Sequence, residues 1–445
     1  MHETISYRNI WRVSYPLILS FFATTVINVT DTAFLGRISH VALGASGLGG
    51  VYFLIFLMAA LGLGIGAQII MARFHGEGKP QRIGVVFDHL LYLTAVLTIG
   101  LIVLHFALAP TLLGSLIKSP EILQSTLDYL SIRAFGFIPA FFMLAFRSFL
   151  TGISTTRPIL YASILMAALN FVFNYAFVFG KFGFPRMEIE GAAYASVLAE
   201  TLSLIYLIGW MAKKKLSTQF QFYRFPKPSF HEMRTILKLA APIMIQHVIS
   251  LGSWLTFFLI IEGMGERPLA ISNVVRSGYS VLMVPLIGIG QATQTLVSSL
   301  IGQGGIHLMR KLVSRLILNS ILSSVVLVLL NLINPKIALS VFTNDPSLIL
   351  ESILIIHVIS ISIVLFSVGM VLLSVISGTG NTLTTLLIEV STLTIYLTFT
   401  YAMVKVYHQP LYIVWSSEIV YFTCIGLFSA GYLWSGKWKN TKVHD

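Results

Sequence analysis

Hydrophobic residues along this chain form runs of about 20 residues or more, and short polar breaks separate them from near the N-terminus to Trp434. Runs of this length span a bilayer as α-helices, whereas an outer-membrane barrel shows alternation over about ten residues. We therefore predict an all-α integral membrane protein with twelve transmembrane helices. The expected spans are residues 12–36, 43–72, 83–107, 124–150, 159–180, 190–212, 236–263, 269–301, 312–342, 347–377, 383–405 and 409–434.

Composition agrees with twelve spans, because 56% of the 445 residues are hydrophobic and 10% are charged. Soluble domains carry about 25% charged residues. The first apolar run is not expected to be a cleaved signal peptide, since it is longer than a signal h-region, contains Asp31 and has no small-residue cleavage site after it. The single cysteine, Cys424, lies in the last expected span, so no intrachain disulfide is expected.

The net charge of +12 comes from lysines and arginines that gather on alternate loops. The two termini and the loops after the second, fourth, sixth, eighth and tenth spans hold 19 of the 29 Lys and Arg residues, and the opposite loops hold 7. Short loops rich in Lys and Arg stay on the cytoplasmic side. We therefore expect a multi-pass protein of the cell inner (plasma) membrane with both termini in the cytoplasm, and no nucleic-acid partner.

The two halves of the chain match each other at a constant repeat offset, which is the separation of Pro16 from Pro242. Because this offset carries the chain through an even number of spans, both halves have the same orientation, which makes a parallel repeat with the substrate path between two lobes. We predict an N-terminal six-helix lobe at 1–212, a hydrophilic cytoplasmic linker at 213–233 and a C-terminal six-helix lobe at 234–445. The other residues that match at the same offset are Gly76 and Gly302, Pro120 and Pro346, Gly152 and Gly378, and Thr156 and Thr382.

A series of short motifs runs through both halves, namely VTDTAFLGRIS, GLGIGAQIIMARFHGEG, RSFLTGISTTRP, LNFVFNYAFVFG, EGAAYAS, IGQGG and VISGTGN. In their order and spacing these motifs resemble the multidrug and toxic compound extrusion (MATE) family of the MOP flippase superfamily. The resemblance covers essentially the whole chain. It implies a V-shaped pair of lobes and a secondary active antiporter, which exports organic cations or amphipathic drugs and metabolites in exchange for Na⁺ or H⁺ by alternating access.

Other functions differ in the residues that they require. A flippase for a lipid-linked or other anionic substrate shares the MATE fold and stays the alternative, although only Arg133, Arg147 and Arg276 lie in or near spans to hold an anion. The stretch ARFHGEGKPQR lacks the G-x-x-x-D-R-x-G-R pattern of major-facilitator proteins. No nucleotide-binding loop or catalytic constellation indicates an enzyme. We therefore expect an ion gradient to drive transport, with no cofactor besides the coupling ion.

Asp31 is a carboxylate inside the first span, where a charge costs a few kcal/mol on insertion scales. From a rise of about 1.5 Å per residue, Asp31, Asn174 and Ser196 all lie roughly 22 Å from the cytoplasmic side. Asn170 and Asn174 project from one helical face. Carboxylate, amide and hydroxyl oxygens suit a small cation, and the carboxylate can instead carry a proton. We predict an ion-coupling site at these four residues and Glu200, with Asp31, Asn170 and Asn174 as ligands if the ion is Na⁺.

The MATE resemblance implies the same positions. It places an essential acid on the first span at Asp31, and an Asn with a second polar or acidic residue on the fifth span at Asn170 and Asn174. Some archaeal and bacterial members have Asp where this chain has Asn174, so the site here carries less negative charge. Ser196 stands where the family often has Thr. The residue that corresponds to Asp31 by the repeat offset is Phe257, so the site is not expected to be duplicated in the second half.

Further polar residues lie inside or at the ends of the spans. Glu200 follows Ser196 by one helical turn, so it either joins the ion site or acts as a separate proton carrier. Whether Glu262 or Glu389 takes part stays open. The cavity should lie between spans 1, 2, 7 and 8, where aromatic and Met surfaces suit cationic amphipaths, and we expect a monomer in the lipid bilayer. The cavity candidates are Tyr52, Met58, Gln68, Gln246, Trp254, Met283, Gln291 and Glu389.

Overall fold

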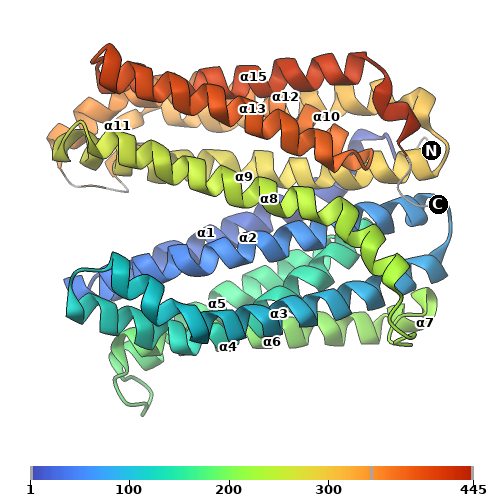
Figure 1. Ribbon diagram of the computed structural model, residues 1–445, viewed down its shortest axis with the longest axis horizontal. Coiled ribbons are helices and arrows are strands. Elements are labelled where there is room, and N and C mark those ends of the chain that lie inside the picture. Colours follow the sequence, from blue (N-terminus) through green and yellow to red (C-terminus); the bar gives the residue numbers. More distant parts are fainter. Residues whose placement is uncertain (1–3, 341–342, 344, 442–445) are drawn as a thin grey trace. The chain divides into compact units, whose positions relative to one another are not determined.

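The computed structural model describes residues 4–340, 343 and 345–441, and every regular element in these residues is a helix. Twelve helical segments are long and apolar enough to cross a membrane, as the hydrophobic runs predict (Figure 1). The prediction of an all-α protein with twelve spans is therefore confirmed. In chain order the elements are α1 (Tyr7–Leu35), α2 (His40–Gly76), α3 (Pro80–Leu116), α4 (Pro120–Gly152), α5 (Arg157–Phe179), α6 (Glu188–Lys213), α7 (Leu216–Phe220), α8 (Phe230–Glu262), α9 (Glu266–Gly302), η1 (Ile306–Leu308), α10 (Met309–Ile333), α11 (Pro335–Ser340), α12 (Pro346–Gly378), α13 (Thr382–Tyr401), η2 (Ala402–Val406), α14 (Leu411–Trp415), α15 (Ser417–Trp434) and η3 (Lys437–Asn440).

The helix ends follow local sequence signals that recur in both halves. Pro120 and Pro346 are the first residues of α4 and α12, where a missing backbone N–H costs nothing. The residues just before them cap these helices, because the Ser119 and Asp345 side chains accept hydrogen bonds from backbone N–H groups of the first turn. Gly76 and Gly302 end α2 and α9, and Gly152 and Gly378 end α4 and α12. Residues related by the repeat offset therefore occupy equivalent places.

Some boundaries differ from the expected spans. The ninth span was expected at 312–342, but α10 ends at Ile333, because Pro335 follows and cannot donate the next helical hydrogen bond. Residues 341 and 342 of that span lie outside the described residues. The last span is divided into α14 and α15 at Ser416. The second and third spans extend beyond their expected limits, because α2 and α3 are each 37 residues long.

Contacts divide the chain into two compact units. The first unit is Leu19–Met244, and the second unit is Met1–Ile18 together with Ile245–Asp445. In the first unit, α2 packs on α4 and α5 packs on α6. In the second unit, α12 packs on α9 and α15, and an aromatic core forms around Phe257 and Trp415. The division into lobes 1–212 and 234–445 with a linker at 213–233 stays a prediction.

Candidate functional site

A chain of hydrogen bonds joins Asp31 on α1 to α5 and α6 within the first unit. The Asn174 amide nitrogen donates to Asp31 Oδ1 at 2.6 Å and to Asn170 Oδ1 at 3.0 Å. The Asn170 amide nitrogen donates in turn to Ser196 Oγ at 3.3 Å. The structure thus brings together the carboxylate, the two amides and the hydroxyl that the sequence places at one depth.

The two asparagines are core residues rather than surface ones, since Asn170 is 1% and Asn174 is 0% exposed. Their spacing of four residues puts both amides on the same face of α5. Asn174 uses both amide hydrogens, yet its Oδ1 is buried and accepts no hydrogen bond from any described residue. A buried polar oxygen without a partner is costly. The cluster therefore offers one acceptor atom beside Asp31 for a cation or another donor.

Packing of α1 and α6 against α5 fixes this geometry. The Ser20 and Ser163 hydroxyls are hydrogen bonded at 2.6 Å, and the Phe34 and Phe171 rings are in contact, so α1 is held on α5 at both ends of the segment that carries Asp31. On the other side, Gly191 of α6 touches the backbone of α5 at Phe177. These contacts determine that Asp31 of α1 and Ser196 of α6 lie next to the two asparagines of α5.

Glu200 has a partner of its own. Arg133 of α4 donates two hydrogen bonds of 3.1 Å to the two carboxylate oxygens of Glu200, and its guanidinium lies 4.0 Å from the centroid of the Phe53 ring. Arg133 is 6% exposed. This buried ion pair could have been suspected from two opposite charges inside spans, but the sequence does not give their contact.

The second unit holds two other buried acids. Glu389 of α13 is 3% exposed and accepts hydrogen bonds from the Ser250 and Tyr421 hydroxyls at 2.7 and 2.6 Å. Glu418 of α15 accepts from the Tyr279 and Tyr396 hydroxyls at 2.7 and 3.0 Å. Glu262, by contrast, is exposed at the end of α8. Both buried carboxylates are thus held by hydroxyl donors within the second unit.

The predicted cavity residues are divided between the two units. Tyr52, Met58 and Gln68 lie on α2 of the first unit, where Tyr52 and Gln68 are buried and the Tyr52 hydroxyl contacts His105 Nδ1 at 3.1 Å. The candidates of the second unit are half-buried apart from Glu389, and they lie on α8, α9 and α13. They are Gln246, Trp254, Met283, Gln291 and Glu389. Their role in a substrate cavity stays a prediction.

Known proteins are similar to this chain in sequence and in fold. A family model described as MatE matches residues 16–176 and 242–402, two segments that begin and end at the same offset as Pro16 and Pro242. A probable multidrug resistance protein NorM of Thermotoga maritima is 26% identical over 426 residues, which are 94% of this chain and 90% of that protein. A protein of the same description from Agrobacterium fabrum is 26% identical over 296 residues, which span only 62% of its length.

A solved structure supports the same fold. It is described as the outward-facing conformation of a multidrug resistance MATE family transporter of the MOP superfamily. The TM-score is 0.90, the sequence identity is 19%, and the match covers 99% of this chain and 98% of the other. At this identity the likeness concerns the arrangement of the helices.

Proposed function

This chain belongs to the MatE family, and from that premise we propose that it is a secondary active antiporter that exports organic cations or amphipathic drugs and metabolites in exchange for Na⁺ or H⁺. The family is one of multidrug efflux transporters, which points to transport rather than enzymatic catalysis. Twelve apolar helices make the chain a multi-pass membrane protein. We assign both termini to the cytoplasmic side of the inner membrane because of the uneven distribution of Lys and Arg.

The observation that carries this proposal is the contact of Asp31 with Asn174 beside a buried oxygen that lacks a partner. A carboxylate at this depth costs free energy unless it is paired, and the group that donates to Asp31 here is the neutral Asn174 amide. A cation or a proton would neutralise the Asp31 charge. The cluster therefore has the chemistry of a site that is filled and emptied during each transport cycle.

Coupling follows from a difference in affinity between states. If the ion binds the Asp31 cluster better in the state that releases substrate, ion binding shifts the protein toward that state, and substrate binding shifts it back. Ion and substrate are then exchanged without leak. Each change between the two states is unfavourable when the Asp31 cluster does not have the occupancy, filled or empty, that the new state prefers. An imposed gradient of the ion would drive the substrate outward.

The coupling ion depends on how many oxygens engage it. The Asp31 carboxylate, Asn174 Oδ1 and Asn170 Oδ1 are hard ligands of the kind that small cations accept in place of water. A proton needs only the Asp31 carboxylate. Both ions use Asp31, so a substitution there tests the site for either one.

The alternative is a flippase for a lipid-linked or other anionic substrate. Such a substrate needs cations that are available to bind it, and Arg133 already donates two hydrogen bonds to Glu200. Arg276 lies over the Trp254 and Phe258 rings. These contacts favour export of cations and amphipaths over the transport of an anion.

The test is efflux of ethidium, a fluorescent organic cation, from proteoliposomes with an imposed Na⁺ or H⁺ gradient. The wild type should respond to one of the two gradients, which identifies the ion. Asp31→Asn keeps the size of the side chain and removes its charge, and we expect ion-driven efflux to fall by about tenfold or more.

Asp345→Asn is the matched control. Asp345 is an exposed N-cap residue of α12, and Asn caps helices as well as Asp does, so this variant should extrude ethidium like the wild type. Normal ion-driven efflux by Asp31→Asn would show that Asp31 is only a structural residue. No efflux by the wild type under either gradient would favour the flippase.

A further inference from the structure

The segment between α6 and α8 is fastened to α3 by side chains that the transport mechanism does not use. The Asp88 carboxylate accepts hydrogen bonds from the backbone N–H groups of Tyr223 at 2.8 Å and Phe225 at 3.2 Å. His89 Nε2 accepts from the backbone N–H of Ser229 at 3.0 Å. A Cβ at Gly84 would lie 2.0 Å from the Phe220 carbonyl oxygen, so the two backbones are in direct contact. The segment is therefore an ordered part of the first unit that is packed on α3.

Its backbone is held in an unusual shape. Four of its residues have positive φ angles, which residues other than glycine rarely adopt. The angles are 53° at Lys215, 58° at Gln221, 63° at Tyr223 and 41° at Phe225. Each such residue costs about 1–3 kcal/mol and persists only where its surroundings enforce it. Here Asp88 holds the N–H groups of two of them. Strain of this kind gathers at functional sites, so the segment is a candidate ligand site.

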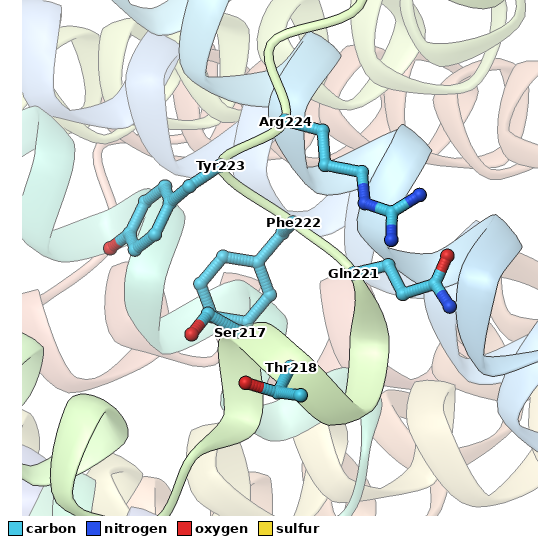
Figure 2. A pocket seen from close by; sticks show the side chains of 6 residues that line it. All are labelled: Ser217, Thr218, Gln221, Phe222, Tyr223 and Arg224. Atoms are coloured by element: carbon cyan, nitrogen blue, oxygen red, sulfur yellow. The ribbon is translucent and has the colours of Figure 1, made fainter.

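This strained segment lines a pocket of about 310 Å³, shown in Figure 2. Its lining residues carry hydroxyl, amide and guanidinium groups, and the Gln221 and Arg224 side chains extend to the same side of the chain in Figure 2. All of these groups can donate hydrogen bonds. The lining residues are Ser217, Thr218, Gln221, Phe222, Tyr223 and Arg224.

The segment and the adjoining parts of α6 and α8 are rich in positive charge. The seven Lys and Arg residues from Lys213 to Lys238 are all exposed, and no ion pair joins any of them to an acid among the described residues. Nearby acids are already engaged, because Asp88 binds backbone N–H groups and Glu232 pairs with Arg82 at 2.9 Å. Burial, with a contribution from the Asp88 carboxylate, raises the pKa of Tyr223 to about 12, so its phenol adds no negative charge at neutral pH.

The pocket also lies next to two membrane-crossing helices. The segment begins where α6 ends at Lys213 and finishes where α8 begins at Phe230. Large aromatic side chains in this segment and at the start of α8 are uncovered, since Tyr223 is 40%, Phe225 51% and Phe230 79% exposed. Exposed aromatic residues beside basic ones are typical of the membrane–water interface. The ligand of this pocket can therefore come from the lipid layer itself.

We propose that this pocket binds the phosphoryl headgroup of an anionic phospholipid from the adjacent leaflet, with Arg224 as its principal charged contact. A guanidinium matches two phosphate oxygens at once, and hydroxyl and amide donors complete the contacts to the remaining oxygens. The surrounding lysines add attraction to the negative leaflet. This site is separate from the Asp31 cluster and does not depend on the coupling ion.

The experiment is a titration of the purified full chain with phosphatidylglycerol or phosphatidylcholine, followed by native mass spectrometry. The wild type should bind its first phosphatidylglycerol more tightly than its first phosphatidylcholine. Arg224→Gln should weaken phosphatidylglycerol binding by about fivefold and leave phosphatidylcholine binding unchanged. Arg224 is exposed, so this variant should melt at the same temperature as the wild type.

Arg310→Gln is the control, because it removes one exposed positive charge from the start of α10, on the side of the membrane that is expected for Arg224 as well. It should leave the affinity for phosphatidylglycerol unchanged. Equal losses in both variants would mean that only bulk charge matters, and equal binding of both lipids by the wild type would mean that the pocket does not select anionic headgroups. Displacement of phosphatidylglycerol by millimolar inorganic phosphate would assign the pocket to free phosphate. Each of these results would overturn the proposal.

Discussion

Asp31 differs from the other acids inside the helices in the partners that surround it. Glu200 is paired with the Arg133 guanidinium, and Glu389 and Glu418 each accept two hydrogen bonds from hydroxyl groups. Asp31 accepts from the Asn174 amide, and an amide oxygen without a partner lies beside it. Asp31 thus differs from the other three acids, because its hydrogen-bond donor is the neutral Asn174 amide and the oxygen of that amide can still accept a hydrogen bond or bind a cation.

The Arg133–Glu200 pair should contribute mainly to stability. Removal of one member of a buried pair leaves an uncompensated charge and costs about 3–5 kcal/mol, so Arg133→Gln or Glu200→Gln should each lower the melting temperature of the purified protein. In the double variant no charge is left unpaired. We expect its loss of stability to be smaller than the sum of the two single losses by about 0.5–3 kcal/mol.

The same variants separate a structural Glu200 from an ion-binding one. If Glu200 serves only Arg133, the double variant should retain ion-driven ethidium efflux once it is reconstituted. A folded double variant that no longer responds to the ion gradient would contradict this account and would make Glu200 part of the coupling site.

The positions of site residues can be predicted from the sequence where they depend on the geometry of a single helix. The spacing of Asn170 and Asn174, and the helical rise that puts Asp31 and Ser196 at their depth, are properties of single helices. The Arg133–Glu200 contact depends on how α4 and α6 are rotated about their axes. A hydrophobic pattern does not fix that rotation closely enough to pair two side chains that are 67 residues apart.

At the scale of elements, the approach of α6 to α5 determines whether the Asn170–Ser196 contact can form. Gly191 is the point of closest approach, because a Cβ there would lie 2.8 Å from the Phe177 carbonyl carbon and 2.9 Å from the Val178 nitrogen. These are backbone atoms, which cannot rotate out of the way. A side chain at this position must push the helices apart.

Gly191→Ala should therefore lower both stability and coupling. Overpacking of this kind costs about 1–3 kcal/mol, and the displaced α6 would draw Ser196 away from Asn170. Melting temperature and ion-driven ethidium efflux measure the two effects. Gly209→Ala is the matched control on the same helix, since no atom beyond its own turns of α6 lies within 4 Å of a Cβ there, and it should behave like the wild type. Equal behaviour of the two variants would refute this view of α5 and α6.

Helix limits were predictable where the chain carries a cap or a proline and less so elsewhere. Pro120 and Pro346 are the first residues of α4 and α12, close to the expected span starts at 124 and 347. The break after Ile333 was missed, because the apolar run continues past Pro335 and hydrophobicity alone suggests one span. The contacts of Asp88 with the segment before α8 were also missed, since they join residues 135 and 137 positions apart.

At the scale of the whole molecule, the two halves share their helices but not their chemistry. The family model matches both halves at the repeat offset that relates Pro16 to Pro242. By that offset Asp31, Asn170 and Ser196 correspond to Phe257, Tyr396 and Phe422. The Phe257 and Tyr396 rings are stacked, with their centroids 5.6 Å apart. Asn174 corresponds to Thr400, whose hydroxyl donates to the Tyr396 carbonyl. Asp31 thus has no carboxylate counterpart at this offset in the second half, which supports a single coupling site of this kind.

In the proposed mechanism the Asp31 cluster holds the coupling ion and releases it when substrate binds. The most direct test is to add ethidium to the purified protein in weakly buffered solution and to record released H⁺ with a pH indicator and released Na⁺ with a sodium-selective electrode. The wild type should release about one of these cations for each ethidium bound, as reciprocal linkage at one site requires. Asp31→Asn should release neither, and Asp345→Asn should match the wild type. Equal release by Asp31→Asn and the wild type would contradict the claim.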